Sequence, residues 1–398
     1  MTEISATLLR WGTPRIFDST VGAPFGALQR TLYRSGVEKI EETYVEEEAA
    51  LEGALRTAAA RSAVVCVAAT DADGAGWAAR LDVLRGLMAK VSRKRLTLSA
   101  KTDTLLPGGT ETVVDPEGAI PLFLLPFSLP HSSRPTLLII TPGGEAVLEH
   151  LRQEIEKQIQ KVFGPQAASR WVGICGVAPG DVLQWVGENL AKTAVEVKSF
   201  PAIAGVDLLF RSRDPLLLNT AMAALEARWG PSCYSWEGET LEEVVGRLLL
   251  EKQKWLAIAE SCTGGRIAAR ITRIPGSSRY FDSASITYSN RSKETLLGVP
   301  SPLLQEKGAV SAEVAHAMAE GIRQRQGVDL GLSVTGIAGP GGGTEQKPVG
   351  LVYIALSDGR QTTVDRFLFR GDRETIQAEA AQRALDRLRR HLIGTGDH

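Results

Sequence analysis

The chain has 398 residues, enough for two or three domains, and its 43% hydrophobic and 23% charged residues are ordinary for a globular protein. A formal net charge of −1 gives no electrostatic basis for a nucleic acid or an anionic membrane as partner. The sequence shows no apolar run of membrane-spanning length, no secretory signal pattern and no CxxC pair among its four cysteines. We therefore expect a cytoplasmic protein without a structural zinc site or a disulfide framework.

Residues 1–165 alternate between apolar runs and amphipathic runs, which predicts a doubly wound α/β domain. Val64–Ala69 and Thr136–Ile140 are expected to be buried strands, and a helix is expected from Glu145 to about Phe163. Gly164 followed by Pro165 ends this helix and marks a boundary.

Two further domains are expected after this boundary. Residues 166–235 mix strand-like and helical runs, which predicts a small α+β unit. Residues 236–398 form a third, α/β domain. Its expected elements are a helix at Thr240–Lys252, strands at 255–260, Ser283–Ser289, 349–356 and 362–369, and helices capped by Ser311 and Asp372.

Four unusual segments of this last domain follow expected strands. They are Ser261–Gly265, Tyr288–Lys293, Thr335–Pro340 and Arg370–Arg373. Each has an ordinary explanation when taken alone, as a helix cap, a glycine turn or a solvated charge. Ligands of open α/β sheets bind at the carboxyl ends of the strands, so the recurrence of these segments predicts one shared pocket.

The residue types in these segments suit a serine amidohydrolase. The chain has no HExxH, Walker or GxSxG motif, and no histidine supports a Ser–His–Asp triad. Lys293, if held neutral, could activate Ser261, with Tyr288 as a hydrogen-bonding relay. Cys262 remains an alternative nucleophile.

Such a set would attack an amide, release ammonia and hydrolyse the acyl-enzyme. The charge that develops on the amide oxygen needs hydrogen-bond donors. Backbone N–H groups near Gly264, Gly265 or Gly336 are candidates for this oxyanion hole.

Six motifs in order resemble the C-terminal domain of CinA proteins, over about residues 238–393. They are AESCTGG at 259–265, ITYSNxxK at 286–293, GAVS at 308–311, TGIAGPGGG at 335–343, KPVG at 347–350 and FRGDR at 369–373. The family includes nicotinamide mononucleotide amidohydrolases of the PncC type. The resemblance implies hydrolysis of nicotinamide mononucleotide to nicotinate mononucleotide and ammonia without a metal or other cofactor, with Ser261 as nucleophile and Lys293 and Tyr288 assisting.

The same resemblance implies a set of substrate-binding residues: Thr263, Gly264, Gly265, Ser278, Thr335, Gly336 and Arg373. Of these, Arg373 would balance the charge of the 5′-phosphate. Ser278 is equally well explained as a helix cap. Because the family commonly forms dimers, a homodimer is expected.

The N-terminal part resembles the other half of two-part CinA proteins, a molybdopterin-binding-like domain followed by a KH-like unit. Gly12-Thr13, Asp18 and Pro142–Glu145 match loops of that domain. The family's Gly-Gly-Leu-Gly-Pro-Thr loop with paired acidic residues is replaced here by Ala69–Gly76, although Asp71 and Asp73 in it could still bind a cation. This departure predicts a degenerate domain, kept for packing, dimerisation or regulation, without the divalent metal and the ADP-ribose pyrophosphatase activity that some members carry.

Three other functions remain open at this point. One is a non-catalytic nucleotide-binding or scaffold protein of the competence- and damage-inducible type. Another is an amidohydrolase that acts on a different nucleotide or amide. The third is an ADP-ribose pyrophosphatase activity on the N-terminal domain.

Overall fold

The computed structural model describes residues 4–11, 27–69, 74–98, 105–114, 121–129, 135–141, 145–164 and 166–395. They fall into two compact units, one ending at Ala168 and the other running from Ser169 onward. The division lies close to the boundary expected at residue 165. Within the described part of the chain, no helix combines the length and apolarity needed to cross a bilayer.

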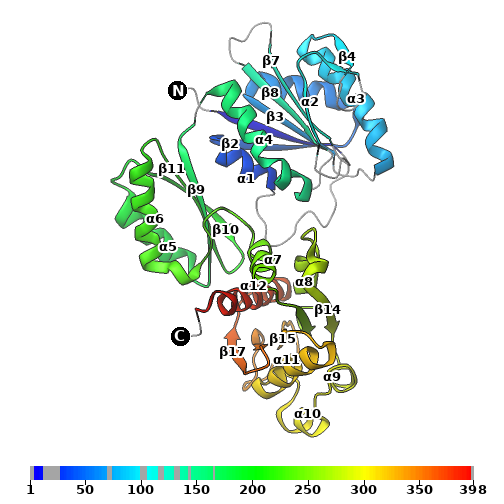
Figure 1. The fold of residues 1–398 in the computed structure, drawn as a ribbon, viewed down its shortest axis with the longest axis vertical. Helices are drawn as coiled ribbons and strands as arrows, with labels where there is room; N and C mark the ends of the chain where they lie inside the picture. Colours follow the sequence, from blue (N-terminus) through cyan, green and yellow to red (C-terminus); the bar gives the residue numbers. More distant parts are fainter. Residues whose placement is uncertain are drawn as a thin grey trace. The chain divides into compact units, whose positions relative to one another are not determined.

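The first unit contains a six-stranded sheet in the order β2-β1-β3-β8-β7-β6, with the first four strands parallel (Figure 1). Its strands are β1 (Ser5–Trp11), β2 (Lys39–Val45), β3 (Val64–Ala69), β6 (Glu111–Val114), β7 (Pro121–Ser128) and β8 (Pro135–Thr141). A separate hairpin pairs β4 (Leu96–Leu98) with β5 (Leu105–Pro107).

Helices cover both faces of this sheet. Val64 and Cys66 belong to a core cluster with the first and last helices, whereas Val65 and Val67 belong to a second cluster with the middle two. In chain order the helices are α1 (Ala27–Arg34), α2 (Glu48–Arg61), α3 (Gly74–Ser92) and α4 (Glu145–Phe163). The alternation of side chains along β3 confirms the predicted doubly wound arrangement.

Several loops that carried the molybdopterin-binding-like interpretation lie outside the described residues. They are Gly12-Thr13, Asp18, the loop with Asp71 and Asp73, and Pro142–Gly144. Within the part of the chain that is described, no group of three or more His, Cys, Asp and Glu side chains is arranged to hold a metal ion.

The second unit begins with a four-stranded sheet in the order β10-β11-β9-β12. Its elements are β9 (Ala168–Cys175), α5 (Pro179–Leu190), β10 (Glu196–Ala202), β11 (Gly205–Ser212), α6 (Pro215–Trp229), the short helix η1 (Gly230–Ser232) and β12 (Cys233–Ser235). Both α5 and α6 pack against β11. The expected α+β unit is therefore present, although strand β10, which contains Pro201 and a single buried residue, was not expected from its sequence.

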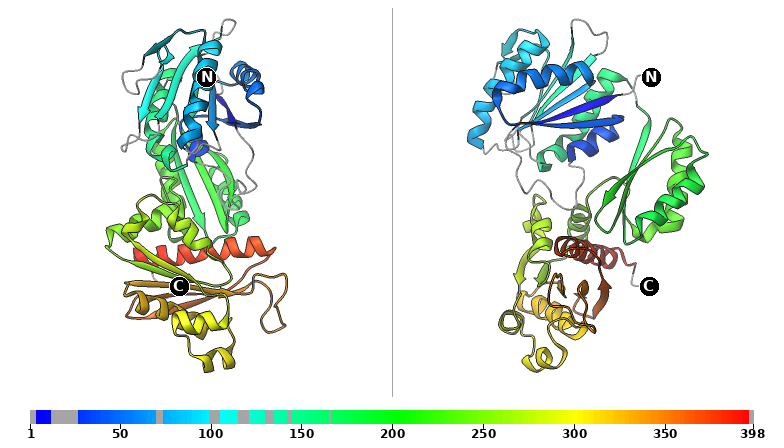
Figure 2. Two further views of the ribbon diagram at one scale, coloured as in Figure 1. Left: turned by 90° about the vertical axis from the view of Figure 1, so that its right-hand side faces the viewer. Right: turned by 180° about the vertical axis from the view of Figure 1, so that it is seen from behind.

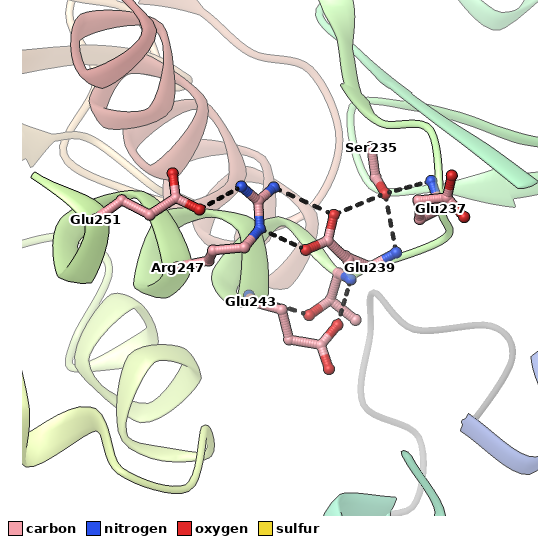
Figure 3. A network of polar contacts seen from close by, with 7 residues as sticks. Ser235, Glu237, Glu239, Glu243, Arg247 and Glu251 are labelled. Carbon is pink, nitrogen blue, oxygen red and sulfur yellow. Dashed lines mark hydrogen bonds and ion pairs between the residues drawn. The ribbon is translucent and has the colours of Figure 1, made fainter. Parts of the chain in front are cut away.

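A polar network fixes the connection from β12 to the next helix, α7 (Leu241–Glu251) (Figure 3). Ser235 Oγ accepts hydrogen bonds from the backbone N–H groups of Glu237 and Glu239, at 3.3 and 2.9 Å. Arg247 on α7 bonds the Glu239 carboxylate at 2.9 Å and the Glu251 carboxylate at 3.1 Å. These bonds hold the connecting segment onto the first turns of α7.

The rest of the second unit is built on a five-stranded sheet in the order β14-β13-β15-β16-β17. Strands β13 (Leu256–Glu260), β14 (Phe281–Ile286) and β15 (Leu330–Gly336) are parallel, and β16 (Leu351–Ser357) and β17 (Thr362–Leu368) continue the sheet in antiparallel pairs. The burial of every residue of β13 agrees with its central place.

Three helices lie on each face of this sheet, and Figure 2 shows α12 in red on one face and the yellow helices on the other. The first face carries α7, α8 (Arg266–Thr272) and α12 (Arg373–Ile393), the second α9 (Asn290–Leu297), α10 (Ser301–Lys307) and α11 (Ala312–Gln326). Ile258 packs toward the first face, whereas Ala257 and Ala259 pack toward the second.

Most expected elements of this domain are confirmed, with one informative difference. Ser311 and Asp372 cap α11 and α12 as predicted. The strand expected at Ser283–Ser289 ends instead at Ile286, because Ser289 caps α9 by accepting a hydrogen bond from the N–H of Ser292. Thr287 and Tyr288 therefore lie in a loop at the end of the sheet.

Helices α9 and α11 approach each other closely at Gly321, where a larger side chain should not fit. A Cβ atom on Gly321, inside α11, would lie 2.1 Å from the backbone oxygen of Leu297 in α9. Gly321→Ala should therefore lower the free energy of unfolding by about 1–3 kcal/mol, despite the helix propensity of alanine. Gly187→Ala is the matched control, because an exposed Cβ there in α5 meets no atom within 4 Å and should be neutral or stabilising. Thermal unfolding measures both, and equal stability of Gly321→Ala and the wild type would contradict the packing.

Candidate active site

The four segments singled out in the sequence meet at one edge of the five-stranded sheet. Strands β13, β14 and β15 are parallel, so Ser261, Thr287 and the turn after Gly336 follow their carboxyl ends at the same edge. The pairs Gly336–Val352 and Leu351–Leu368 place the end of β17 there as well. The topology thus provides the shared edge that the sequence predicted.

The centre of the site is a contact between a serine and a lysine that are 32 residues apart in the sequence. The Nζ atom of Lys293 lies 3.1 Å from the Oγ atom of Ser261 and donates a hydrogen bond to the carbonyl oxygen of Thr287 at 2.6 Å. Lys293 is 1% exposed and Ser261 is 7% exposed. Two of the predicted catalytic residues are therefore brought together in a nearly dry environment.

Burial changes the chemistry of the lysine. Removal from water disfavours the charged ammonium and lowers the pKa of Lys293 to about 8. A neutral amine keeps N–H donors and gains one lone pair. With an N–H directed to the Thr287 carbonyl, the lone pair can accept the hydroxyl proton of Ser261. This is the arrangement of an activated nucleophile, a base and a group that orients the base.

The alternative nucleophile is in a different environment. Cys262 is 5% exposed and belongs to the apolar core cluster of the domain. Burial raises the pKa of its thiol to about 12, so the reactive thiolate is disfavoured. The geometry therefore supports Ser261 over Cys262.

A buried carboxylate organises the loop around the serine. Glu260 is fully buried, and its carboxylate accepts hydrogen bonds from the N–H groups of Gly265 at 2.9 Å, Ala268 at 2.9 Å and Ile267 at 3.3 Å. Its backbone oxygen accepts the N–H of Thr287 at 2.7 Å. We predicted no role for Glu260 from the sequence. An acidic residue at the end of an apolar strand could have indicated a buried side chain that needs hydrogen-bond partners.

The glycines of the loop are structural rather than oxyanion donors. Gly264 and Gly265 have φ angles of 62° and 95°, which favour glycine. The N–H of Gly264 donates to the Ser261 carbonyl, and the N–H of Gly265 donates to Glu260. Both amides are thus already bonded within the protein, which leaves the other N–H groups near these glycines and near Gly336 as the candidates for the oxyanion hole. The hydroxyl of Thr263, which is 1% exposed, has no hydrogen-bond partner among the described residues.

Arg373 connects two other predicted segments. Its guanidinium donates to the carbonyl of Gly339 at 2.7 Å and to the hydroxyl of Tyr288 at 3.0 Å. The Tyr288 side chain is exposed, and no described hydrogen bond joins it to Ser261 or Lys293. The structure therefore places Tyr288 beside Arg373 rather than between the serine and the lysine.

Three other predicted residues have definite places. Thr335 is buried and its hydroxyl donates to the carbonyl of Ala309 at 2.8 Å. Gly336 packs closely on β16, since a Cβ atom would lie 2.6 Å from Val352. Ser278 is exposed in the short helix η2 (Ser277–Arg279), just before the amino end of β14. Because Ser261 follows the carboxyl end of the parallel strand β13, the structure does not bring Ser278 to Ser261.

Comparison with known proteins identifies the family. The family model described as the CinA C-terminal domain matches residues 238–392. A CinA-like protein of a Synechococcus species is 33% identical, with 99% of this chain and 99% of that protein covered. This chain belongs to the CinA family. A putative competence-damage inducible protein of Moorella thermoacetica is 38% identical over 79% of this CinA-family chain and 76% of its own length.

Other CinA relatives match over shorter regions. A CinA-like protein of Geobacter metallireducens is 52% identical, over 44% of this chain and 43% of its own length. Among solved structures, the competence damage-inducible protein A of Klebsiella pneumoniae is 35% identical, with 38% of this chain and 95% of that chain covered and a TM-score of 0.38.

The buried Lys293 predicts a pH-dependent stability for this CinA-family protein. Its pKa is about 8 in the folded chain and near 10.5 when exposed. Between these values only the unfolded state holds the proton, so the free energy of unfolding should rise with pH. Relative to Lys293→Met, the wild type should gain about 2–3 kcal/mol between pH 7 and pH 10.

Urea unfolding at both pH values measures this difference. Lys252→Met, which removes an exposed lysine, is the control and should show no comparable change. A constant difference between the wild type and Lys293→Met across this range would contradict the lowered pKa.

Proposed function

We propose that this site hydrolyses the carboxamide of nicotinamide mononucleotide to nicotinate mononucleotide and ammonia. The observation that carries the proposal is the buried Lys293 amine, 3.1 Å from the hydroxyl of Ser261 and with a lowered pKa. A nucleophile next to a base is the requirement of acyl transfer, and a protein that only binds a nucleotide has no need of it. The substrate itself is proposed from the motifs that resemble the amidohydrolases of the CinA family.

The proposed reaction has two steps, acylation of the serine and hydrolysis of the resulting ester. Lys293 accepts the Ser261 proton while Oγ attacks the amide carbon, and the tetrahedral intermediate collapses when the nitrogen leaves as ammonia with that proton. A water molecule then attacks the resulting ester with Lys293 again as base. This second step releases the carboxylic acid and restores the serine.

Arg373 supplies the charge that a phosphorylated substrate requires. It is the first residue of α12, and its guanidinium can pair with an anion. We propose that the 5′-phosphate lies against Arg373 and the Tyr288 hydroxyl.

Nicotinamide riboside, which lacks this phosphate, should therefore be a poorer substrate. We expect the change mainly as a higher KM.

The direct test is ammonia release from nicotinamide mononucleotide by the full-length protein, with and without EDTA. We expect turnover that survives EDTA and that falls at least about 10³-fold in Ser261→Ala, because the nucleophile is lost. Cys262→Ser is the matched control in the same loop and should retain activity, since the buried thiol takes no part in the reaction.

The outcomes separate the functions that the sequence left open for this site. Binding of nicotinamide mononucleotide without ammonia release by the folded wild type would support a non-catalytic nucleotide-binding protein. Turnover of a different amide alone would keep the serine mechanism and change the substrate. Full activity in Ser261→Ala would overturn the mechanism.

A further inference from the structure

One carbonyl group of the nucleophile loop, that of Cys262, is held by a side chain from another element. The carbonyl of Cys262 accepts a hydrogen bond from Nε2 of Gln377, on α12, at 2.6 Å. Arg266 Nε donates to the Oε1 atom of the same side chain at 3.3 Å. Because Oε1 is engaged as the acceptor, the amide nitrogen of Gln377 is left as the donor to the loop.

This hydrogen bond determines the direction of the next N–H group. A trans peptide is planar, so the N–H of Thr263 points opposite to the carbonyl of Cys262. The carbonyl points toward Gln377 on α12, which covers one face of the sheet, while Lys293 comes from α9 on the other face. The N–H of Thr263 therefore points away from Gln377 and α12.

The backbone N–H group of Thr263 can donate a hydrogen bond to a ligand. Within residues 166–395, no hydrogen bond from this N–H to a protein acceptor is found, and the Thr263 hydroxyl is also unpartnered at 1% exposure. By contrast, Gly264 and Gly265 use their N–H groups within the protein. A buried donor beside a nucleophile suits an oxygen that gains negative charge during the reaction.

We propose that Gln377 is a positioning residue that turns the Thr263 N–H toward the oxyanion formed when Ser261 attacks an amide. Gln377 touches neither Ser261 nor the substrate, and it acts through the peptide bond between Cys262 and Thr263. This inference rests on the proposed amidohydrolase function for its kinetic consequence. The orientation of the peptide is a separate, structural consequence.

Gln377→Glu is the sharpest test, because it keeps the size of the side chain and the acceptor for Arg266 but cannot donate to the Cys262 carbonyl when ionised. A missing oxyanion donor lowers kcat and leaves ground-state binding nearly unchanged. We expect kcat for nicotinamide mononucleotide to fall about 10- to 100-fold with KM within about twofold. The matched control is Glu374→Gln, which removes the other, exposed partner of Arg266 and should leave kcat unchanged.

A crystal structure of Gln377→Glu gives a readout that needs no substrate. We expect the peptide between Cys262 and Thr263 to rotate, with the contact between Ser261 and Lys293 retained. An unchanged peptide, or a kcat equal to that of the wild type, would overturn the positioning role. If the wild type releases no ammonia but the peptide rotates in the variant, the proposed function fails while the structural role of Gln377 stands.

Discussion

The arrangement of the site depends on the burial of one amine. Transfer of a lysine from water into a protein is costly, and it is tolerated when polar groups meet the nitrogen and the proton can be lost. Both conditions hold for Lys293, which meets the Thr287 carbonyl and the Ser261 hydroxyl in a setting that lowers its pKa to about 8. The same burial that reduces stability at neutral pH makes the amine available as a base.

The fold holds this amine through the ends of three parallel strands. Lys293 reaches the site from α9, whose start is set by the early end of β14 at Ile286. Glu260 connects the serine loop to the loop that carries Thr287. Gln377 holds the serine loop from the α12 side. The nucleophile is thus fixed by contacts from both faces of the sheet, which is the pre-organisation that electrostatic catalysis needs.

The sequence predicted those parts of the site that depend on strand order. Parallel strands bring their carboxyl ends to one edge, so the proximity of Ser261 and Lys293 could be anticipated across a separation of 32 residues. The contacts of Thr287 and Gln377 could not, because they depend on which backbone groups remain unpaired in the folded loop. For the same reason the sequence does not show that the folded loop uses the N–H groups of Gly264 and Gly265 internally. Ser278 rested on the family resemblance alone, and a turn at the amino end of β14 does not reach Ser261 within the same chain.

The role of Lys293 as the base is tested most directly by a titration of this residue in the intact protein. Lysine labelled with ¹³C at Cε reports the protonation of each amine by NMR, and the Lys293 signal can be assigned by its loss in Lys293→Met. We expect a midpoint of about 8 for this residue. A midpoint near 10.5, the ordinary value for lysine, would leave almost no neutral amine at neutral pH and would contradict its role as the base.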